Sequence, residues 1–479
     1  MGDFARKRTK IVATVGPASR DPATLRALLR AGVDVVRLNF SHGSHAEHGA
    51  TIDDVRRIAR ELDRPIAILQ DLPGPKVRTG KLAGGVDAVL LEKGATFTLT
   101  TEHVAGTANV VGVSYPGLAR DVTPGAQIYL ADGALVLSIL ATTPTTIQTR
   151  VEVGGLLRGE QGINYPDGTL GIATVTPRDF EHLAFGLEHG IDWVAVSFVR
   201  AVEDVLSVKR FIAERGQTVP VMAKIEKHEA LDSIEEILAA ADGLMVARGD
   251  LGIEIPLEQV PLVQKDLIAR ANRASKPVVT ATQMLESMIT SPRPTRAETT
   301  DVANAIIDGT DAVMLSAETA RGAYPIEAVR VMATIALEVE RHYPHALLHA
   351  RRVERTSRVG SAAIAQSAVR VSGELGLGVI VCGTATGATA ATIASFRPQA
   401  RVVALTLGAD VARRLNVVWG VDARVVPPFD YFEELVTLAE EHVLRDGVPG
   451  EMEFVLTAGM PIGTGTNVLK IHRLDDSAT

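Results

Sequence analysis

Short apolar runs rich in β-branched residues recur through the first two thirds of the chain, and each run ends in polar residues. Amphipathic stretches lie between several of them, at residues 24–30, 55–62, 204–214, 230–240, 260–274 and 300–308. This alternation is typical of parallel strands joined by crossover helices. The eight predicted strands span residues 11–15, 33–40, 65–70, 191–198, 219–225, 243–248, 277–281 and 311–316. Eight such units predict a closed (β/α)8 barrel, with the active site at the carboxyl ends of the strands.

The third and fourth predicted strands begin about 125 residues apart, which is far more than the spacing of the other neighbours. The inserted segment, residues 77–173, is rich in Thr, Val and Gly, and turn residues such as Pro124-Gly125 divide it. Its short alternating runs are at residues 96–100, 127–130, 135–140 and 146–153. We predict a small antiparallel β-barrel domain that acts as a lid over the catalytic end of the large barrel.

A third unit follows the polar, Arg-rich stretch at residues 345–358. Here strands predicted at residues 377–382, 402–406, 421–426, 454–457 and 467–472 alternate with helices, notably at 359–372 and 431–445. This pattern predicts a separate, open α/β domain. The expected domains are therefore the barrel at residues 1–76 and 174–345, the insert at 77–173, and a regulatory α/β domain at 346–479.

The composition narrows the possible functions. The chain has 479 residues, enough for about three domains, and its formal net charge is −8 with 4% aromatic residues. Nucleic-acid binding requires a basic field and usually stacking platforms, so we expect no nucleic-acid partner. No run of 18 uncharged apolar residues is present, and the single cysteine, Cys382, gives no indication of an oxidising compartment. We therefore expect a cytoplasmic protein with no membrane partner.

Polar side chains close every predicted barrel strand. Because the strand ends of a barrel converge on one mouth, we expect these side chains to share a site. The residues are Thr14, Arg37, Asn39, Ser41, Asp71, Ser197, Lys224, Glu226, Arg248, Asp250, Thr280, Thr282, Ser316 and Glu318.

Lys224 and Glu226 lie two residues apart, and therefore on the same side of an extended strand end. Asp250 follows the next strand along the chain. Two carboxylates from neighbouring strands make an open site of the kind that Mg²⁺ occupies beside phosphates. Lys224 would add positive charge where a transferred phosphoryl group develops negative charge. The alternative is a structural Lys–Glu ion pair with a capping Asp.

Gly249 and Thr282 are candidates for binding an anion beside this cation site. Gly249 has no Cβ and lets a ligand approach the backbone, and a short helix starting near Asp250 would offer free N–H groups. The Thr282 hydroxyl is placed to donate to the same anion. Alternatively, Thr282 caps a helix at residues 283–288.

Arg37 offers a planar guanidinium suited to phosphate. His42, His45 and His48 follow at three-residue spacing, but they belong to a predicted helix start and have no matching ligands elsewhere, so we do not expect zinc. Phosphate-loop, dinucleotide-binding and nucleophile-elbow motifs are missing from the sequence. A nucleotide would therefore bind through another architecture.

The chain resembles the pyruvate kinase family, with matches that run nearly from end to end. They include TKIVATVGPAS at residues 9–19, VRLNFSHG at 36–43, AKIEK at 223–227, ARGDLG at 247–252 and ATQMLESM at 281–288. The resemblance implies a barrel with an inserted β domain and a C-terminal α/β domain. It also implies transfer of the phosphoryl group of phosphoenolpyruvate to ADP, which gives pyruvate and ATP in glycolysis.

The resemblance also implies roles for individual residues. Glu226 and Asp250 would ligate Mg²⁺ or Mn²⁺. The expected catalytic residues are Lys224, Arg37 and Thr282. The expected substrate-binding residues are Arg37, Arg248, Gly249, Asp250 and Thr282, and the expected nucleotide-binding residues are His42, Arg78 and Asp132.

Many family members bind an activating K⁺ at positions that match Asn39, Ser41, Asp71 and the backbone carbonyl of Leu72. The K⁺-dependent enzymes carry Glu where this chain has Lys76. An ammonium at that position would supply the missing positive charge, so we expect that K⁺ is not required. Gln161 stands where many relatives carry a Lys near the nucleotide, and this leaves the nucleotide preference open.

In the C-terminal domain, Thr384, Thr386, Gly387 and Thr389 lie between a predicted strand and a helix. Their hydroxyls and amides are placed to hold the phosphate of an effector, and the family often binds sugar phosphates or nucleotides here. The alternative is an ordinary strand–helix turn. By resemblance, we also expect a homotetramer.

Two other functions fit part of this pattern. Lyases and aldolases that act on phosphoenolpyruvate or pyruvate use similar Mg²⁺ barrels but need no ADP. A metabolite-sensing or scaffold protein on an inactive barrel is the second alternative. The insert with Asp132, together with Arg37 and Arg78, favours an enzyme that uses a nucleotide, and the presence of Lys224 argues against an inactive barrel.

Overall fold

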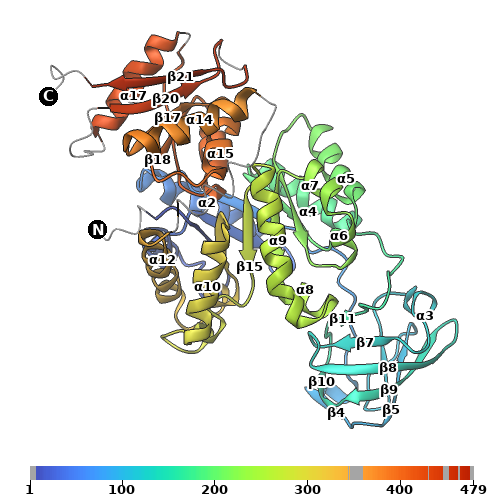
Figure 1. Ribbon diagram of the computed structural model, residues 1–479. Coiled ribbons are helices and arrows are strands. Elements are labelled where there is room, and N and C mark those ends of the chain that lie inside the picture. Colours follow the sequence, from blue (N-terminus) through green and yellow to red (C-terminus); the bar gives the residue numbers. More distant parts are fainter. Residues whose placement is uncertain are drawn as a thin grey trace.

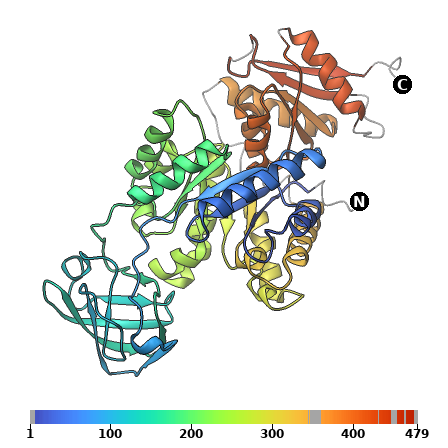
Figure 2. The same ribbon diagram turned by 180° about the vertical axis from the view of Figure 1, so that it is seen from behind.

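The computed structural model describes residues 7–343, 345, 360–429, 431–445, 453–461 and 464–474. Three units follow one another along the molecule, with the barrel between the C-terminal domain and the insert (Figure 1). The view from behind shows the same order (Figure 2). The Arg-rich stretch that predicted the last domain boundary lies almost entirely outside the described residues.

Eight parallel strands close into the predicted barrel, in the ring order β1-β2-β3-β12-β13-β14-β15-β16. The strands are β1 (Lys10–Thr14), β2 (Val35–Asn39), β3 (Ala67–Asp71), β12 (Trp193–Val196), β13 (Val221–Ile225), β14 (Gly243–Ala247), β15 (Val278–Ala281) and β16 (Ala312–Leu315). Pairing of Lys10 with Ala312 closes the ring. All eight predicted strands are confirmed. They could be recognised in the sequence because a strand that is covered on both faces appears as a short apolar run.

Helices cover the outside of the barrel. Those that follow the strands are α1 (Pro22–Ala31), α2 (His45–Glu61), α4 (Pro177–Glu188), α5 (Val202–Ala213), α7 (Ile234–Ala240), α9 (Val260–Arg273), α10 (Arg296–Asp308) and α12 (Pro325–Arg341). Capping boxes fix the starts of α2, α4 and α10; in α10, Thr295 and Glu298 satisfy each other's backbone amides. Shorter helices at the strand ends are α6 (Glu229–Asp232), α8 (Arg248–Glu254) and α11 (Ala317–Ala320).

Two predicted helices differ from the structure. The helix expected over residues 230–240 is interrupted at Ser233, which separates α6 from α7. The helix expected over residues 283–288 is wrong, because only a short 3-10 turn, Glu286–Ile289, forms there. The reason is that Thr282 and Gln283 adopt φ angles of +68° and +56°, a left-handed backbone from which a helix cannot start.

The insert leaves the barrel after β3 and returns before α4. Its strands are β4 (Ala88–Leu91), β5 (Thr96–Thr100), β6 (Val110–Gly112), β7 (Gln127–Leu130), β8 (Leu135–Thr142), β9 (Thr146–Val153), β10 (Gly155–Arg158) and β11 (Ile163–Asn164), with a short helix α3 (Leu118–Asp121). The four predicted strands are all present. The ladders form a six-stranded sheet, β11-β7-β8-β9-β5-β6, and a two-stranded sheet, β10-β4. Pairing is antiparallel except between β5 and β6, and hydrogen bonds do not join these two sheets into one ring.

The C-terminal domain is the predicted open α/β sheet. Its strands are β17 (Val379–Gly383), β18 (Arg401–Thr406), β19 (Val421–Val425), β20 (Glu453–Ala458) and β21 (Val468–Arg473), in the order β19-β18-β17-β20-β21. Its helices are α14 (Gly360–Leu375), α15 (Ala388–Ser395), α16 (Ala409–Arg414) and α17 (Phe432–Arg445). All pairs are parallel except β20 with β21.

This domain packs against the amino ends of the barrel strands. Arg397 donates to Asp311, just before β16, at 3.0 Å, and Arg413 donates to Asp192, just before β12, at 2.7 Å. The C-terminal domain therefore lies on the side of the barrel away from the strand ends that carry the candidate site. In the described part of the chain, we find no helix with both the length and the apolar character that a membrane span needs.

Candidate active site

Lys224 occupies the mouth of the barrel near the end of β13. Its ammonium nitrogen lies 2.6 Å from Ser197 Oγ, 2.9 Å from Glu226 Oε1 and 3.1 Å from Asp71 Oδ1. The Lys224 side chain is only 10% exposed. Because a buried ammonium needs compensating charge, the two carboxylates are what allow it to stay protonated there.

Arg37, on β2, completes this buried cluster on the other side of Asp71. Its Nε donates to Asp71 Oδ2 at 2.7 Å, and one terminal nitrogen donates to Thr14 Oγ1 at 2.9 Å. The other terminal nitrogen lies 2.7 Å from the same Asp71 oxygen. One carboxylate thus holds Arg37 and Lys224 next to each other.

The pKa values follow from this arrangement. Burial opposes the charged form of Lys224, but Asp71 and Glu226 outweigh it and raise the pKa to about 12. Burial also opposes the charged form of Asp71, yet Lys224 and Arg37 hold the pKa of Asp71 below its usual value. Lys224 therefore keeps its positive charge through the physiological pH range.

Glu226 and Asp250 form the candidate metal site. Burial raises the pKa of Glu226, and repulsion from Asp250 and Asp71 raises it further, although Lys224 acts in the opposite direction. Glu226 Oε2 also accepts the amide of Phe198 at 2.7 Å, which fixes the carboxylate. Two neighbouring carboxylates that repel each other are a donor set that a hard divalent cation would stabilise, so these residues fit Mg²⁺.

Gly249 and Thr282 meet at the ends of β14 and β15. The expected short helix near Asp250 is present as α8, but the amide of Gly249 is not free, because it donates to Thr282 Oγ1 at 2.8 Å. Thr282 caps no helix. Arg248, also expected to bind substrate, pairs instead with Asp301 and with the Thr282 carbonyl, each at 2.7 Å.

A cavity of about 50 Å³ lies where the insert meets the barrel. The charged residues on its wall are Lys76, Arg200, Lys227 and Asp250. Insert residues such as Asn164 and Tyr165 form the opposite wall. The candidate metal ligand Asp250 therefore borders a cleft that the insert covers.

None of the three expected nucleotide-binding residues lines this cavity: Arg78 and Asp132 lie in the insert, and His42 lies in the barrel. Arg78 donates to the Glu160 carbonyl at 3.0 Å, and Asp132 Oδ1 lies 3.9 Å from Lys76 Nζ. The Asp132 side chain is 74% exposed, so its carboxylate is accessible to a ligand. His42 follows β2 and is also exposed.

The neighbouring histidines are held by local contacts. His45 Nε2 lies 2.7 Å from His182 Nδ1, and His48 Nε2 donates to the His42 carbonyl at 2.8 Å. The His48 ring also stacks on Phe40 with 4.1 Å between ring centroids. The rings of His45 and His48 therefore have partners within the protein.

The positions expected to hold K⁺ make internal hydrogen bonds. Asn39 Oδ1 accepts the amide of Ser41 at 3.1 Å, and the Leu72 carbonyl accepts the Ser197 hydroxyl at 2.7 Å. The ammonium of Lys76 lies beside Asp132 of the insert. The positive charge of Lys76 is therefore located at the cleft between insert and barrel.

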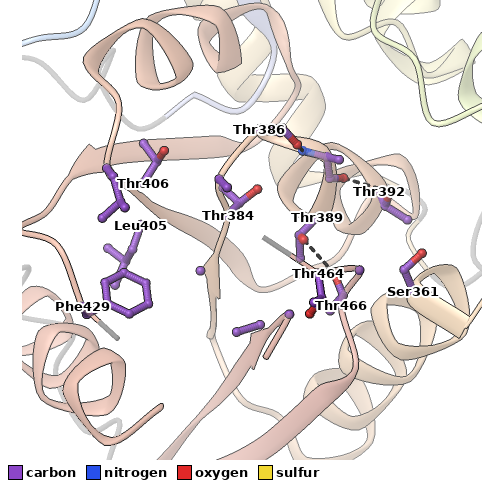
Figure 3. Close-up of a pocket in the computed structure, with 17 residues that line it drawn as sticks. Ser361, Thr384, Thr386, Thr389, Thr392, Leu405, Thr406, Phe429, Thr464 and Thr466 are labelled. Atoms are coloured by element: carbon purple, nitrogen blue, oxygen red, sulfur yellow. Dashed lines mark hydrogen bonds between the residues drawn. The ribbon is translucent and has the colours of Figure 1, made fainter. Parts of the chain in front are cut away.

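A larger cavity, of about 260 Å³, opens in the C-terminal domain. Hydroxyl side chains gather around it (Figure 3). Its lining includes the expected Thr384, Thr386 and Thr389, and also Ser361, Thr392, Thr406, Thr464 and Thr466, which sequence analysis missed because they come from separate elements. The expected Gly387 is not part of the lining; it adopts φ +89° and is the N-cap residue directly before α15.

Sequence analysis also missed Glu254, whose side chain is fully buried. It lies 2.6 Å from Lys227 Nζ and 3.3 Å from His228 Nδ1, and Asn164 of the insert donates to it at 3.4 Å. His228, Glu229 and Glu254 could together ligate a metal, but Lys227 already supplies the local positive charge. The signal in the sequence that could have pointed to Glu254 is the presence of an acidic residue between two isoleucines, Ile253 and Ile255.

We predict that Asp71→Ala will destabilise the barrel, because it leaves Arg37 and Lys224 buried without their shared counter-charge. The free energy of unfolding should fall by about 3 kcal/mol. Chemical denaturation measures this loss. Asp54→Ala, which removes one of the carboxylate partners of the exposed Arg57, is the matched control and should leave the midpoint nearly unchanged. Equal midpoints for Asp71→Ala and wild type would contradict the prediction.

Comparison with known proteins identifies the family. The family model for the pyruvate kinase barrel domain matches residues 6–329, and that for the pyruvate kinase alpha/beta domain matches residues 362–472. Pyruvate kinase 2 of Synechocystis sp. is 45% identical over 97% of this chain and 79% of the relative. A pyruvate kinase of Geobacillus stearothermophilus is 44% identical over 98% of this chain and 81% of the relative.

A solved structure gives the same result. The crystal structure of a pyruvate kinase from Cryptosporidium parvum matches with a TM-score of 0.93 and 34% identity, and the match covers 99% of this chain and 97% of that one. The fold and the sequence relatives agree. The chain belongs to the pyruvate kinase family and is a phosphotransferase.

Proposed function

We propose that the charge cluster around Lys224 carries out phosphoryl transfer from phosphoenolpyruvate to ADP, the substrate pair that family membership implies. The observation that supports this is the buried ammonium of Lys224, held between Asp71 and Glu226 and close to Asp250. A phosphoryl group in transfer spreads negative charge over its oxygens. Fixed positive charge in a partly dry site is what stabilises that charge.

Glu226 and Asp250 would hold the divalent cation, Mg²⁺ or Mn²⁺. When bound, the cation neutralises phosphate charge and orients the phosphoryl oxygens. Arg37 would bind the phosphate of phosphoenolpyruvate, and Asp71 would anchor both Arg37 and Lys224. Because these groups are fixed before substrate arrives, little reorganisation is needed during transfer.

Gly249, Asp250 and Thr282 would line the pyruvate end of the substrate. The Thr282 hydroxyl oxygen is held by the Gly249 amide, so its position relative to α8 is set. His42 from the barrel, together with Arg78 and Asp132 from the insert, would contact ADP. The insert covers the cleft and would exclude water when it closes on the bound nucleotide.

We infer that K⁺ is not needed. Lys76 borders the cavity that also contains Asp250, so a positive charge is already part of the chain at this cleft. A covalently attached ammonium removes the need to recruit a monovalent cation from solution.

We also propose that the C-terminal cavity binds an effector through one phosphate group. Hydroxyl side chains and the start of α15 suit a phosphate. None of the described lining residues carries a charge, so a second phosphate would lack a cation to pair with. A ligand with one phosphate group therefore fits this lining better than a bisphosphate.

A homotetramer, acting in the cytoplasm, completes the proposal. Leu257 and Leu262 on the barrel are 73% and 68% exposed, and exposed large apolar side chains mark contact surfaces. Cys382 is buried and free, as expected in a reducing compartment.

We predict that Lys224→Met keeps the fold and Mn²⁺ binding but lowers kcat by about a hundredfold to a thousandfold, the loss typical of a key transition-state donor. ATP formation from phosphoenolpyruvate and ADP is the measurement. Lys209→Met is the control, because Lys209 pairs with Asp242 outside the mouth. Unchanged turnover of Lys224→Met would refute its role.

We predict that wild-type turnover is nearly the same with and without K⁺ at constant ionic strength. Lys76→Glu should create a requirement for K⁺, because a carboxylate at that position needs a cation beside it. Lys81→Glu, which lies in the insert, serves as the control. A large stimulation of the wild type by K⁺ would show that Lys76 does not replace the cation.

We predict that a sugar monophosphate shifts the phosphoenolpyruvate saturation curve more than the corresponding bisphosphate. Thr389→Val should remove the shift, since it deletes a hydroxyl in the cavity, whereas Thr334→Val on α12 should not. No shift with any phosphorylated metabolite would argue against the effector site.

We predict that light scattering of the same samples gives four copies of the chain per particle.

A further inference from the structure

The turn after β15 is held in an unfavourable backbone conformation. Thr282 and Gln283 both have left-handed φ angles, +68° and +56°, although each carries a Cβ. Such conformations persist only where surrounding groups hold them, and they concentrate at functional sites. Thr282 is one of the residues proposed to line the substrate, so whatever holds this turn also sets the geometry of the reaction.

Arg248 is the group that holds the turn. Its Nε donates to the Ala281 carbonyl at 3.3 Å. One terminal nitrogen donates to the Thr282 carbonyl at 2.7 Å and contacts the sulfur of Met284 at 2.8 Å. A single guanidinium therefore binds three of the four residues from 281 to 284.

The remaining donors of Arg248 fix the guanidinium to the outer helices. The other terminal nitrogen lies 2.7 Å from Asp301 Oδ1 on α10 and 3.4 Å from Gln264 Oε1 on α9. All five N–H donors of the guanidinium thus have a partner within the protein. The side chain is only 10% exposed. No donor is left for substrate, which differs from the substrate contact expected from the sequence.

The position of Arg248 in the chain extends its effect to the metal site. It is the first residue of α8, directly before Gly249 and the proposed metal ligand Asp250. The Gly249 amide also donates to Thr282 Oγ1. Arg248 and Gly249 together join the start of α8 to the turn at Thr282, so the metal ligand and the substrate-lining hydroxyl move as one unit.

We propose that Arg248 is a positioning residue, which holds Thr282 in its left-handed conformation and fixes α8 relative to it. This inference rests on the proposed roles of Asp250 and Thr282. This role depends on the shape of the guanidinium, because its nitrogens reach acceptors in the turn after β15, on α9 and on α10. A lysine would keep the charge but cannot span those acceptors.

The test compares Arg248→Ala, Arg248→Lys and Asp301→Asn with wild type. We expect kcat/KM for phosphoenolpyruvate to fall about tenfold to a hundredfold in both Arg248 variants, as for a displaced active-site group, and less in Asp301→Asn. Millimolar guanidinium chloride should restore part of the activity of Arg248→Ala only. Arg210→Ala, which removes an exposed partner of Glu203, is the control and should respond like wild type.

Several outcomes would overturn the proposal. One is an Arg248→Ala variant as active as wild type. Another is an Arg248→Lys variant that keeps wild-type kcat/KM, because this would show that charge alone suffices, as in a direct substrate contact. A third is full activity of Asp301→Asn together with no rescue of Arg248→Ala by guanidinium. Failure of the wild type to form ATP would instead refute the proposed function, so the two failures are distinguishable.

Discussion

Four charged side chains are buried together at the mouth of the barrel, and the rest of the site depends on keeping them paired. Arg37, Asp71, Lys224 and Glu226 leave water on folding, which is costly unless each charge meets an opposite one in good geometry. The ring order β2-β3-β12-β13 places their strands side by side, and Ser197 fills the position after β12. The cluster therefore exists only when the barrel is closed, and the positive charge needed for phosphoryl transfer is a product of the fold.

The insert is placed over this cluster by its connection to the barrel. The chain leaves for the insert at the end of β3, a few residues after Asp71, so the insert must lie above the mouth. Buried Glu254 then joins the two parts, because it binds Lys227 on the barrel side and Asn164 on the insert side. Glu254 thus anchors the base of the insert to the barrel.

The C-terminal domain lies on the side of the barrel opposite to the candidate site. Its contacts reach Asp311 and Asp192, which precede β16 and β12. Both strands then run through the barrel to the mouth. The C-terminal domain and the candidate site therefore meet opposite ends of these two strands.

The sequence by itself determined the barrel, the insert and the third domain, because buried strands and their spacing can be recognised within short windows. It also placed Lys224 and Glu226 on one side of a strand, since side chains alternate with a period of two. Only the tertiary structure decided the conformation of Thr282, the partners of Arg248 and the burial of Glu254. Their partners lie on separate elements, between 26 and 90 residues away for Glu254 and up to 53 residues away for Arg248. Contacts over such distances depend on how whole elements pack, which no local pattern of apolar and polar residues contains.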